Sequence, residues 1–210
     1  MTEPLTGSTL RELDWYAEDL GARVFTHCRF DDVDLTEATS KGALFENCRF
    51  SNCRFNASRH LGTAFVACEF LRCNFFDATL TGCKLSGSLL IDCRLHPLTV
   101  AGGLWRGVTA RGTDLSRLVL TDLDLSEADL SEADLSRTDL RRSRLDGATL
   151  RRTDLTDADL RGASLAGVDL AAARLDRTRI DLPTAVLLAE AAGALVDLAE
   201  GWGSEHSELP

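Results

Sequence analysis

Ser40 and His60 are the two residues of this sequence that could act as a nucleophile and its general base. An imidazole that takes the proton of a serine hydroxyl creates the nucleophile of many hydrolases, but an acid must orient the imidazole and an oxyanion hole must stabilise the intermediate. The sequence specifies neither feature near these two positions. We therefore expect His60 to turn outward or to form a hydrogen bond near Ser40, as polar residues at core positions usually do.

Seven cysteines could bind zinc or form disulfides. Each lies two residues before a multiple of five, no C-x2-C pair occurs, and no series of histidines accompanies them. Zinc sites usually contain such pairs, whereas free cysteine behaves as a small buried hydrophobe. We therefore expect no metal and no disulfide, and we expect the thiols to pack in the core. The cysteines are Cys28, Cys48, Cys53, Cys68, Cys73, Cys83 and Cys93.

A third set of reactive residue types is Ser204-Glu205-His206, close to the C-terminus. It falls in residues 201–210, which we expect to form a flexible tail, and the rest of the sequence contains no phosphate-binding loop and no metal-binding cluster. The sequence therefore favours a protein that is not an enzyme, with no cofactor and no small-molecule substrate.

A five-residue repeat positions all of these side chains, and it is clearest from Ala128 to Leu160. Leucine occupies every fifth position there, and Ala, Thr or Ser lies two residues before it. A helix would place residues i and i+5 about 140° apart, and a strand would place them on opposite faces. The chain must therefore turn once in every five residues, and the same register continues from Leu20 to Ile180.

Two inward positions in each repeat predict a solenoid. The residue at each multiple of five and the residue two before it point to the same side, as in a short strand, while the other three positions are mostly polar. Glycine recurs every twenty residues from Gly42 to Gly102, which four sides per coil explain. The same count predicts that Phe25, Phe45 and Phe65 stack one above another.

The repeat resembles the signature A(D/N)LXX of the pentapeptide-repeat family, which is met at residues 128–130, 133–135 and 158–160 and more loosely over most of the chain. The resemblance implies an all-β solenoid, a right-handed quadrilateral β-helix of about eight coils. We expect the β-helix at residues 20–182. An N-terminal cap at residues 1–19 should cover its open end with Leu10, Leu13, Trp15 and Tyr16.

Residues 96–110 are the main irregularity in the repeat. Pro97, Gly102 and Gly103 weaken the pattern, but Val100 and Trp105 keep the register. We therefore expect a bend in the solenoid without a long inserted loop.

A belt of acids follows this bend. Residues 114–139 contain eight acids and two arginines, Arg117 and Arg137, which gives a local net charge of −6. Stacked like charges repel, so neighbouring arginines or a basic partner must compensate them. The acids could form a solvated face or a partner surface, and the sequence does not decide between these two interpretations. We define the acidic belt as Asp114, Asp122, Asp124, Glu127, Asp129, Glu132, Asp134 and Asp139, together with Asp154 in the same column as Asp114 and Asp134.

Residues 183–200 should form a C-terminal helix and a dimerisation segment. Pro183 suits a first helical turn and Gly193 suits a C-terminus, so we expect the helix from Pro183 to about Ala192. Its apolar residues are too many for one short solvated helix. The expected dimerisation residues are Val186, Leu187, Leu188, Leu195 and Val196.

This ending, and the absence of a second domain, resemble the quinolone-resistance members of the family, the Qnr and MfpA type. The resemblance implies a homodimer joined through the C-terminus, which imitates B-form DNA, binds DNA gyrase and protects the enzyme from quinolone-like or natural inhibitors, or modulates it. The alternative function is a structural scaffold for a partner other than gyrase.

Charge arithmetic limits this mimicry. Eight coils span roughly 38 Å at about 4.8 Å per coil, and DNA of that length carries roughly 22 phosphate charges. Residues 21–180 contain 22 acids and 22 bases, so the formal charge of −10 comes from the two ends of the chain. The arithmetic favours a patterned negative centre, and it disfavours direct nucleic-acid binding because no basic face outweighs the acids.

The sequence favours a cytoplasmic protein without a membrane span. Its N-terminus lacks the basic start and apolar run of a secretory signal. No stretch approaches the roughly 20 apolar residues that cross a bilayer.

Overall fold

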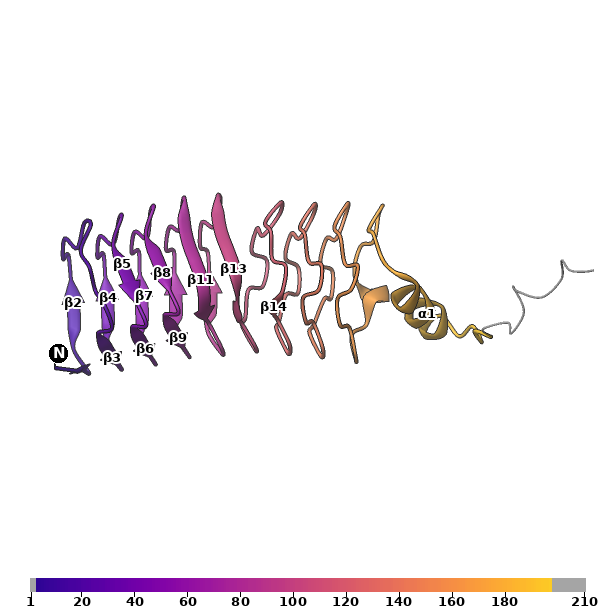
Figure 1. Ribbon diagram of the computed structural model, residues 1–210, viewed down its shortest axis with the longest axis horizontal. Helices are drawn as coiled ribbons and strands as arrows, with labels where there is room; N and C mark the ends of the chain where they lie inside the picture. The colour runs from indigo at the N-terminus through magenta and orange to yellow at the C-terminus, as the bar shows by residue number, and fades with distance from the viewer. Residues whose placement is uncertain (1–2, 198–210) are drawn as a thin grey trace, which may run out of the picture.

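The main chain winds around one long axis and stacks each coil on the one before it (Figure 1). The computed structural model describes residues 3–197. Parallel pairing joins residues that lie twenty places apart, from Leu5 with Phe25 to Asp159 with Arg179. Residues 5–179 therefore make just under nine coils at twenty residues a coil. The expected all-β solenoid with four five-residue sides is confirmed, with slightly more coils than the eight expected.

The additional coil comes from the N-terminus. Strands β1 (Leu5–Thr6) and β2 (Thr9–Arg11) pair in register with the next coil, and Asp14 forms a bridge with Asp34. Residues 5–19 therefore belong to the solenoid itself, and they are not a separate cap as the sequence suggested. Leu10, Leu13 and Trp15 are half-buried against the core, whereas Tyr16 is exposed.

Short parallel strands form two ladders along the rod. The first continues from β1 through β3 (Val24–Thr26), β6 (Leu44–Glu46), β9 (Ala64–Val66), β11 (Ala78–Lys84), β13 (Leu98–Leu104) and β14 (Leu123–Asp124), and β5 (Thr39–Lys41) and β8 (Arg59–Leu61) join it beside β11. The second contains β2, β4 (Arg29–Asp31), β7 (Arg49–Ser51), β10 (Glu69–Leu71) and β12 (Leu89–Ile91).

The core is a stack of identical side chains. The rings of Phe25 and Phe45 lie 4.8 Å apart, and those of Phe45 and Phe65 lie 4.9 Å apart. These separations match the spacing of neighbouring strands, so each ring rests on the ring of the next coil. Leucine takes over in the second half, where Leu135 and Leu140 are fully buried.

The corners of the coil share one backbone conformation. From Gly7 to Arg177, the residue two places after each multiple of five has φ between 50° and 74°, with three exceptions. The exceptions are Ala22, Pro97 and Ala172. This left-handed conformation costs most residues about 1–2 kcal/mol but costs glycine little. It explains why glycine recurs at this corner position.

A helix closes the C-terminal end of the described chain (Figure 1). After a turn of 3-10 helix, η1 (Leu170–Ala172), helix α1 runs over Leu182–Ala191, one residue earlier than expected. The carboxylate of Asp181 accepts hydrogen bonds from the backbone and hydroxyl of Thr184 at 3.1 and 2.8 Å, and so caps the helix. Gly193 ends it with a φ of 87°. Within residues 3–197, no helix has the length and apolar character needed to cross a membrane.

The spacing between coils widens after β13 (Figure 1), and two sides of the rod lose their pairing there. Residues 94 and 99 pair with the preceding coil but form no bridge with residues 114 and 119 in the following one. Pairing of Gly103 with Leu123 keeps the coils together on another side. No loop is inserted at this opening, because the twenty-residue pairing of Gly103 with Leu123 spans it; the expected bend stays a prediction.

Candidate partner-binding surface

Six acids of the belt hold the turns of the solenoid. Each lies one residue before a multiple of five, and its carboxylate accepts a hydrogen bond from the backbone N–H two residues later, at 2.8–3.1 Å. This local bond satisfies a turn donor that the next coil does not reach. Asp at these positions therefore has a structural role whether or not a partner binds. The six are Asp114, Asp124, Asp129, Asp134, Asp139 and Asp154.

Three acids of the belt lie at corners and have no such structural bond. Asp122, Glu127 and Glu132 occupy left-handed corner positions with φ of 56°, 60° and 64°. Their side chains are 56%, 60% and 45% exposed. These three carboxylates are exposed and free of a turn bond, whereas Asp114, whose side chain is 64% exposed, is held by its bond to the turn.

The belt surrounds the rod. Asp124, Asp129, Asp134 and Asp139 lie on four successive sides, because each pairs with the residue twenty places later on its own side. The corner acids lie between those sides. A partner could therefore meet carboxylates from any direction around this part of the axis.

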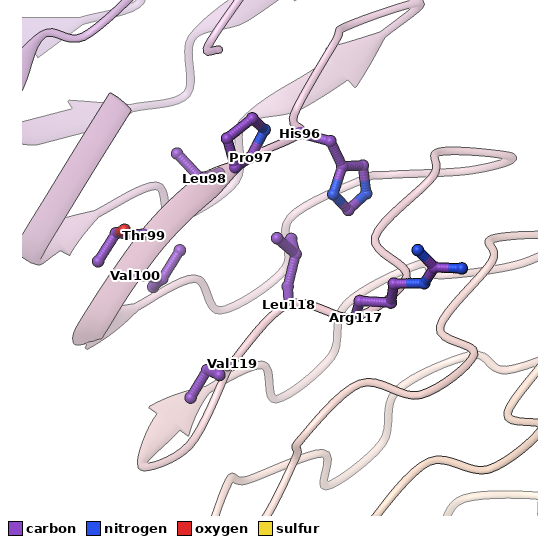
Figure 2. Close-up of a pocket in the computed structure, with 8 residues that line it drawn as sticks. All are labelled: His96, Pro97, Leu98, Thr99, Val100, Arg117, Leu118 and Val119. Carbon is purple, nitrogen blue, oxygen red and sulfur yellow. The ribbon is translucent and has the colours of Figure 1, made fainter. Parts of the chain in front are cut away.

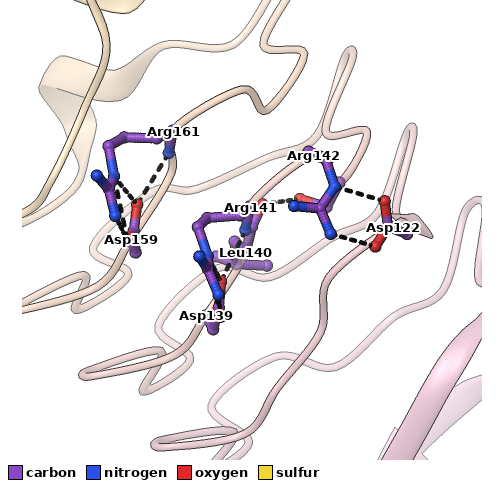
Figure 3. A network of polar contacts seen from close by, with 8 residues as sticks. Asp122, Asp139, Leu140, Arg141, Arg142, Asp159 and Arg161 are labelled. Carbon is purple, nitrogen blue, oxygen red and sulfur yellow. Dashed lines mark hydrogen bonds and ion pairs between the residues drawn. The ribbon is translucent and has the colours of Figure 1, made fainter.

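Arginines of the same and of neighbouring coils neutralise most of the belt. Asp122 forms a bidentate pair with Arg142, at 2.7 and 2.9 Å, and Asp139 pairs with Arg141 at 2.6 Å (Figure 3). The hydrogen bonds from these arginines lower the pKa of both carboxyls. The sequence left open whether arginines or a basic partner compensate the negative charge of the belt. The structure shows compensation by neighbouring arginines.

Most of the remaining belt acids are paired as well, over a wider range of distances. Glu127 meets Arg106 at 2.6 Å, and Glu132 lies within 3.6–3.9 Å of three arginines. Among residues 3–197, Asp134 is the single belt acid with neither an arginine nor a histidine partner. The other pairs are Asp114 with His96, Asp124 with Arg144, Asp129 with Arg111 and Asp154 with Arg174.

The first two coils carry acids that sequence reasoning missed. Within the described part of the chain, five acids there have no ion pair to a cation, in contrast to the belt. The signal was present, because these residues obey the five-residue register, but assigning residues 1–19 to a cap separated three of them from the repeat. They are Glu12, Asp14, Asp19, Asp32 and Glu37.

Ser40 and His60 are both buried, and their polar groups are satisfied. Ser40 Oγ lies 2.6 Å from His60 Nδ1 and 2.7 Å from Thr63 Oγ1, and His60 Nε2 lies 3.1 Å from Ser58 Oγ. Burial lowers the pKa of His60 to about 4. His60 does not turn outward; the expected hydrogen bond to Ser40 is the arrangement found, and no carboxylate takes part in it.

The cysteines pack in the core. All seven are free, and each thiol donates to the carbonyl 23 residues earlier, as Cys48 does to Phe25 at 3.4 Å. Ser88 and Thr153 make the same bond at 2.8 and 2.7 Å. Burial raises the pKa of the Cys83 thiol to about 11. Residues 3–197 contain no group of three potential ligands placed to hold a metal ion.

The expected dimerisation residues divide into two sets. Val186 and Leu188 are half-buried, and Leu188 packs against the core. Leu187, Leu195 and Val196 are exposed, Leu195 to 97%. Ser204, Glu205 and His206 lie outside the described residues.

Comparison with known proteins identifies relatives by sequence pattern and by fold. The family model for pentapeptide repeats matches in eight copies, over residues 24–59, 64–96, 106–142 and 138–180. A search of curated proteins finds no match.

Two solved structures of one protein share the solenoid. Full-length QnrB1, described as a plasmid-mediated fluoroquinolone resistance protein, matches with a TM-score of 0.76 at 16% identity, over 91% of this chain and 100% of that chain. A trypsin-treated variant of QnrB1 matches with a TM-score of 0.62 at 18% identity, over 92% of this chain and 98% of that chain. At these identities the likeness establishes a common fold.

Proposed function

The chain belongs to the pentapeptide-repeat family, and we propose that it is a non-enzymatic binding protein that imitates DNA, interacts with DNA gyrase and protects or modulates that enzyme in the presence of quinolone-like or natural inhibitors. The observation that carries the proposal is the ring of carboxylates on all four sides of a narrow rod. The fold shared with a fluoroquinolone resistance protein supports it. Such a function would place the protein in the cytoplasm.

The size and charge of the rod favour partial mimicry. Nearly nine coils at about 4.8 Å span roughly 42 Å, and B-form DNA of that length carries roughly 25 phosphate charges. The chain has a formal charge of −10, less than half of that. We infer that a basic DNA-binding surface of gyrase would engage selected carboxylates, chiefly those at the corners of the belt.

The corner acids suit this role because a partner can compete for them. Asp122, Glu127 and Glu132 are bound to the fold only through exposed arginines, and exposed ion pairs contribute little to stability. A cationic surface could take over these carboxylates while the arginines turn to solvent. The six turn acids would keep their backbone bonds and add fixed negative charge.

Dimerisation through the C-terminus would lengthen the rod. Leu187 on α1 and Leu195 and Val196 beyond it expose apolar surface at the end of the solenoid, and burial against a second copy would remove it from water. Such a dimer would bring two belts onto one axis. Sedimentation of the full chain and of a Leu187→Glu/Leu195→Glu variant tests this, since only the variant should be monomeric.

A supercoiling titration tests the proposed function. Purified gyrase, relaxed plasmid and ciprofloxacin are mixed with increasing amounts of the protein. We expect supercoiling to recover as the protein is added, or to be inhibited when the drug is omitted. No change at any ratio of protein to gyrase, with or without drug, would exclude gyrase as the partner under those conditions.

A scaffold for another partner is the second candidate, and the arginine pairing favours it. Because arginines cancel most of the belt, residues 21–180 present a mixed-charge surface. Such surfaces discriminate partners by pattern more than by total charge. Affinity capture from native lysate separates the two functions, since gyrase subunits should be recovered only under the first.

A further inference from the structure

The two walls of the opening after β13 carry unpaired backbone groups. Over most of the solenoid the residue at a multiple of five donates its N–H to the carbonyl 19 residues later, as Leu90 does to Thr109 at 2.9 Å and Leu115 does to Asp134 at 2.8 Å. Within the described residues, the N–H groups of Leu95 and Val100 make no such bond to the following coil. One wall of the opening therefore presents free donors.

The facing wall is unpaired in the same way. Asp129 donates its N–H to Val108 of the preceding coil at 2.9 Å, and Asp134 donates to Thr113 at 3.0 Å. Asp114 and Val119 hold the equivalent positions at the opening, yet neither donates to the preceding coil in the part of the chain described. Main-chain donors and acceptors that would normally satisfy each other thus face an open space, and leaving such groups unpaired is costly once water is excluded.

The space between the walls is a groove with a volume of about 580 Å³ (Figure 2). This lies within the range of about 300–1,000 Å³ typical of ligand sites. Leu98, Val100 and Leu118 are buried and form an apolar floor, while Val119 is 55% exposed at the edge. The remaining lining residues are His96, Pro97, Thr99 and Arg117.

The edges of the groove carry uncompensated positive charge. Arg117 lines the groove, and Arg94 lies on the opposite wall; neither forms an ion pair within residues 3–197. In the preceding coils the position of Arg94 is held by Arg54, which reaches Asp34 at 2.8 Å. The residue at the equivalent position before Arg94 is Asn74, which carries no charge, and Asp114 on the facing wall is paired with His96 at 3.1 Å.

We propose that this groove binds an extended acidic peptide segment of a partner protein, which lies between the two coils as an added strand. Strand addition is the binding mode that satisfies backbone donors and acceptors on a wall, and alternate side chains of the added strand would reach the apolar floor. A carboxylate of the peptide would meet Arg117, and a second would meet Arg94. The site does not depend on a gyrase partner, because its chemistry comes from the opening alone.

The test uses the full-length, 15N-labelled protein and a blocked peptide of alternating β-branched and acidic residues, Ac-TVEVEVT-NH2. We expect saturable binding, with slower amide exchange at Val100 and Val119 than in the free protein. Amides in closed parts of the coil, such as Leu130, should not change. A peptide with lysine in place of glutamate should bind about tenfold more weakly or worse.

Two matched variants locate the site. Arg117→Glu should weaken binding of the acidic peptide by about tenfold, whereas Arg179→Glu, at another arginine with no ion pair in the described chain, should not. Both arginines are exposed, so circular dichroism should show both variants folded. The proposal fails if no binding occurs up to millimolar peptide, or if the two variants bind equally well. Since gyrase takes no part, this outcome is independent of the supercoiling titration.

Discussion

Ser40 and His60 lie one above the other in adjacent coils, and Ser40 Oγ donates a hydrogen bond of 2.6 Å to His60 Nδ1. The direction follows from the rest of the network. Ser58 Oγ gives its proton to the carbonyl of Phe55 at 2.7 Å, so it must accept the Nε2–H of the imidazole. Thr63 in turn donates to Ser40. The imidazole is held neutral with its proton on Nε2. Both side chains are buried and the described network contains no carboxylate, so the pair lacks the substrate access and the orienting acid of a catalytic serine and histidine.

The protein should become less stable as the pH falls and the His60 imidazole is forced to take up a proton. Its folded pKa of about 4 lies below the unfolded value of about 6.5, so between these pH values the unfolded chain binds a proton that the folded chain does not. The free energy of unfolding should therefore drop by about 3 kcal/mol from pH 7 to pH 4. Urea unfolding of wild type and His60→Leu across this range measures it, and the pH-dependent loss should shrink in the variant.

A surface histidine provides the control. His27→Asn, at an exposed corner with φ of 55°, should keep the full loss between pH 6.5 and 4. If His60→Leu and wild type lose stability in parallel, the imidazole does not titrate as the buried network requires. Carboxylates with lowered pKa values add a further loss at lower pH, and both proteins share it.

Glycine at position 103 should be required for the packing of two coils. Gly103 has a φ of 129°, and a Cβ there would lie far inside van der Waals contact with the carbonyl oxygen of Cys83. Gly103→Ala should therefore cost several kcal/mol or prevent folding. Gly87→Ala is the control, because its Cβ would meet no atom within 4 Å and only the left-handed strain of about 1–2 kcal/mol applies. Similar unfolding midpoints for the two variants would contradict the close approach.

Helix α1 should depend on one carboxylate. Asp181 caps α1 through Thr184 and also accepts the N–H of Gly162 at 2.8 Å, which ties the helix to the preceding coil. Asp181→Ala should destabilise the helix by about 1–2 kcal/mol, seen as faster amide exchange along α1 while the coil amides keep their rates. Glu190→Ala, on the exposed side of the same helix, should leave the exchange slow. Equal exchange in the two variants would show that packing alone holds α1.

The corner acids should affect binding more than folding. A variant with Asp122→Asn, Glu127→Gln and Glu132→Gln should keep its melting temperature, since exposed ion pairs contribute little. It should need more protein for half-maximal protection of gyrase and should show a weaker salt dependence.

A control with the same change in charge separates position from total charge. Glu46→Gln, Glu69→Gln and Asp92→Asn remove three acids from the coils before the belt. If this variant loses as much protection as the corner variant, overall charge decides binding and the belt has no special role.

The inward half of the structure could be predicted from the sequence, and the outward half could not. A period of five fixes which residues face the core, so the stacking of Phe25 on Phe45 followed directly. The first coil was missed because its second inward positions are atypical: Glu18 stands where a small residue is expected, and it reaches Arg23 at 3.0 Å. A terminal coil has one side free of neighbours and tolerates such a residue.

The five-residue period could not predict which side chains form pairs. Arginine is long enough to reach carboxylates at several neighbouring positions, so the sequence could not say that Arg142 would take Asp122 while Arg141 takes Asp139. His60 was predictable in position but not in orientation. The hydroxyls of Ser58 and Thr63 at neighbouring inward positions were the signal that a buried imidazole would find partners.

The opening after β13 also divides the rod mechanically. Each coil is stabilised by its two neighbours, so a stack comes apart first where adjacent coils share the fewest bonds. The plane between residues 93–100 and 114–119 is such a place. Under tension or denaturant, the phenylalanine-filled block and the leucine-filled block should separate there and melt as two units, each with its own midpoint.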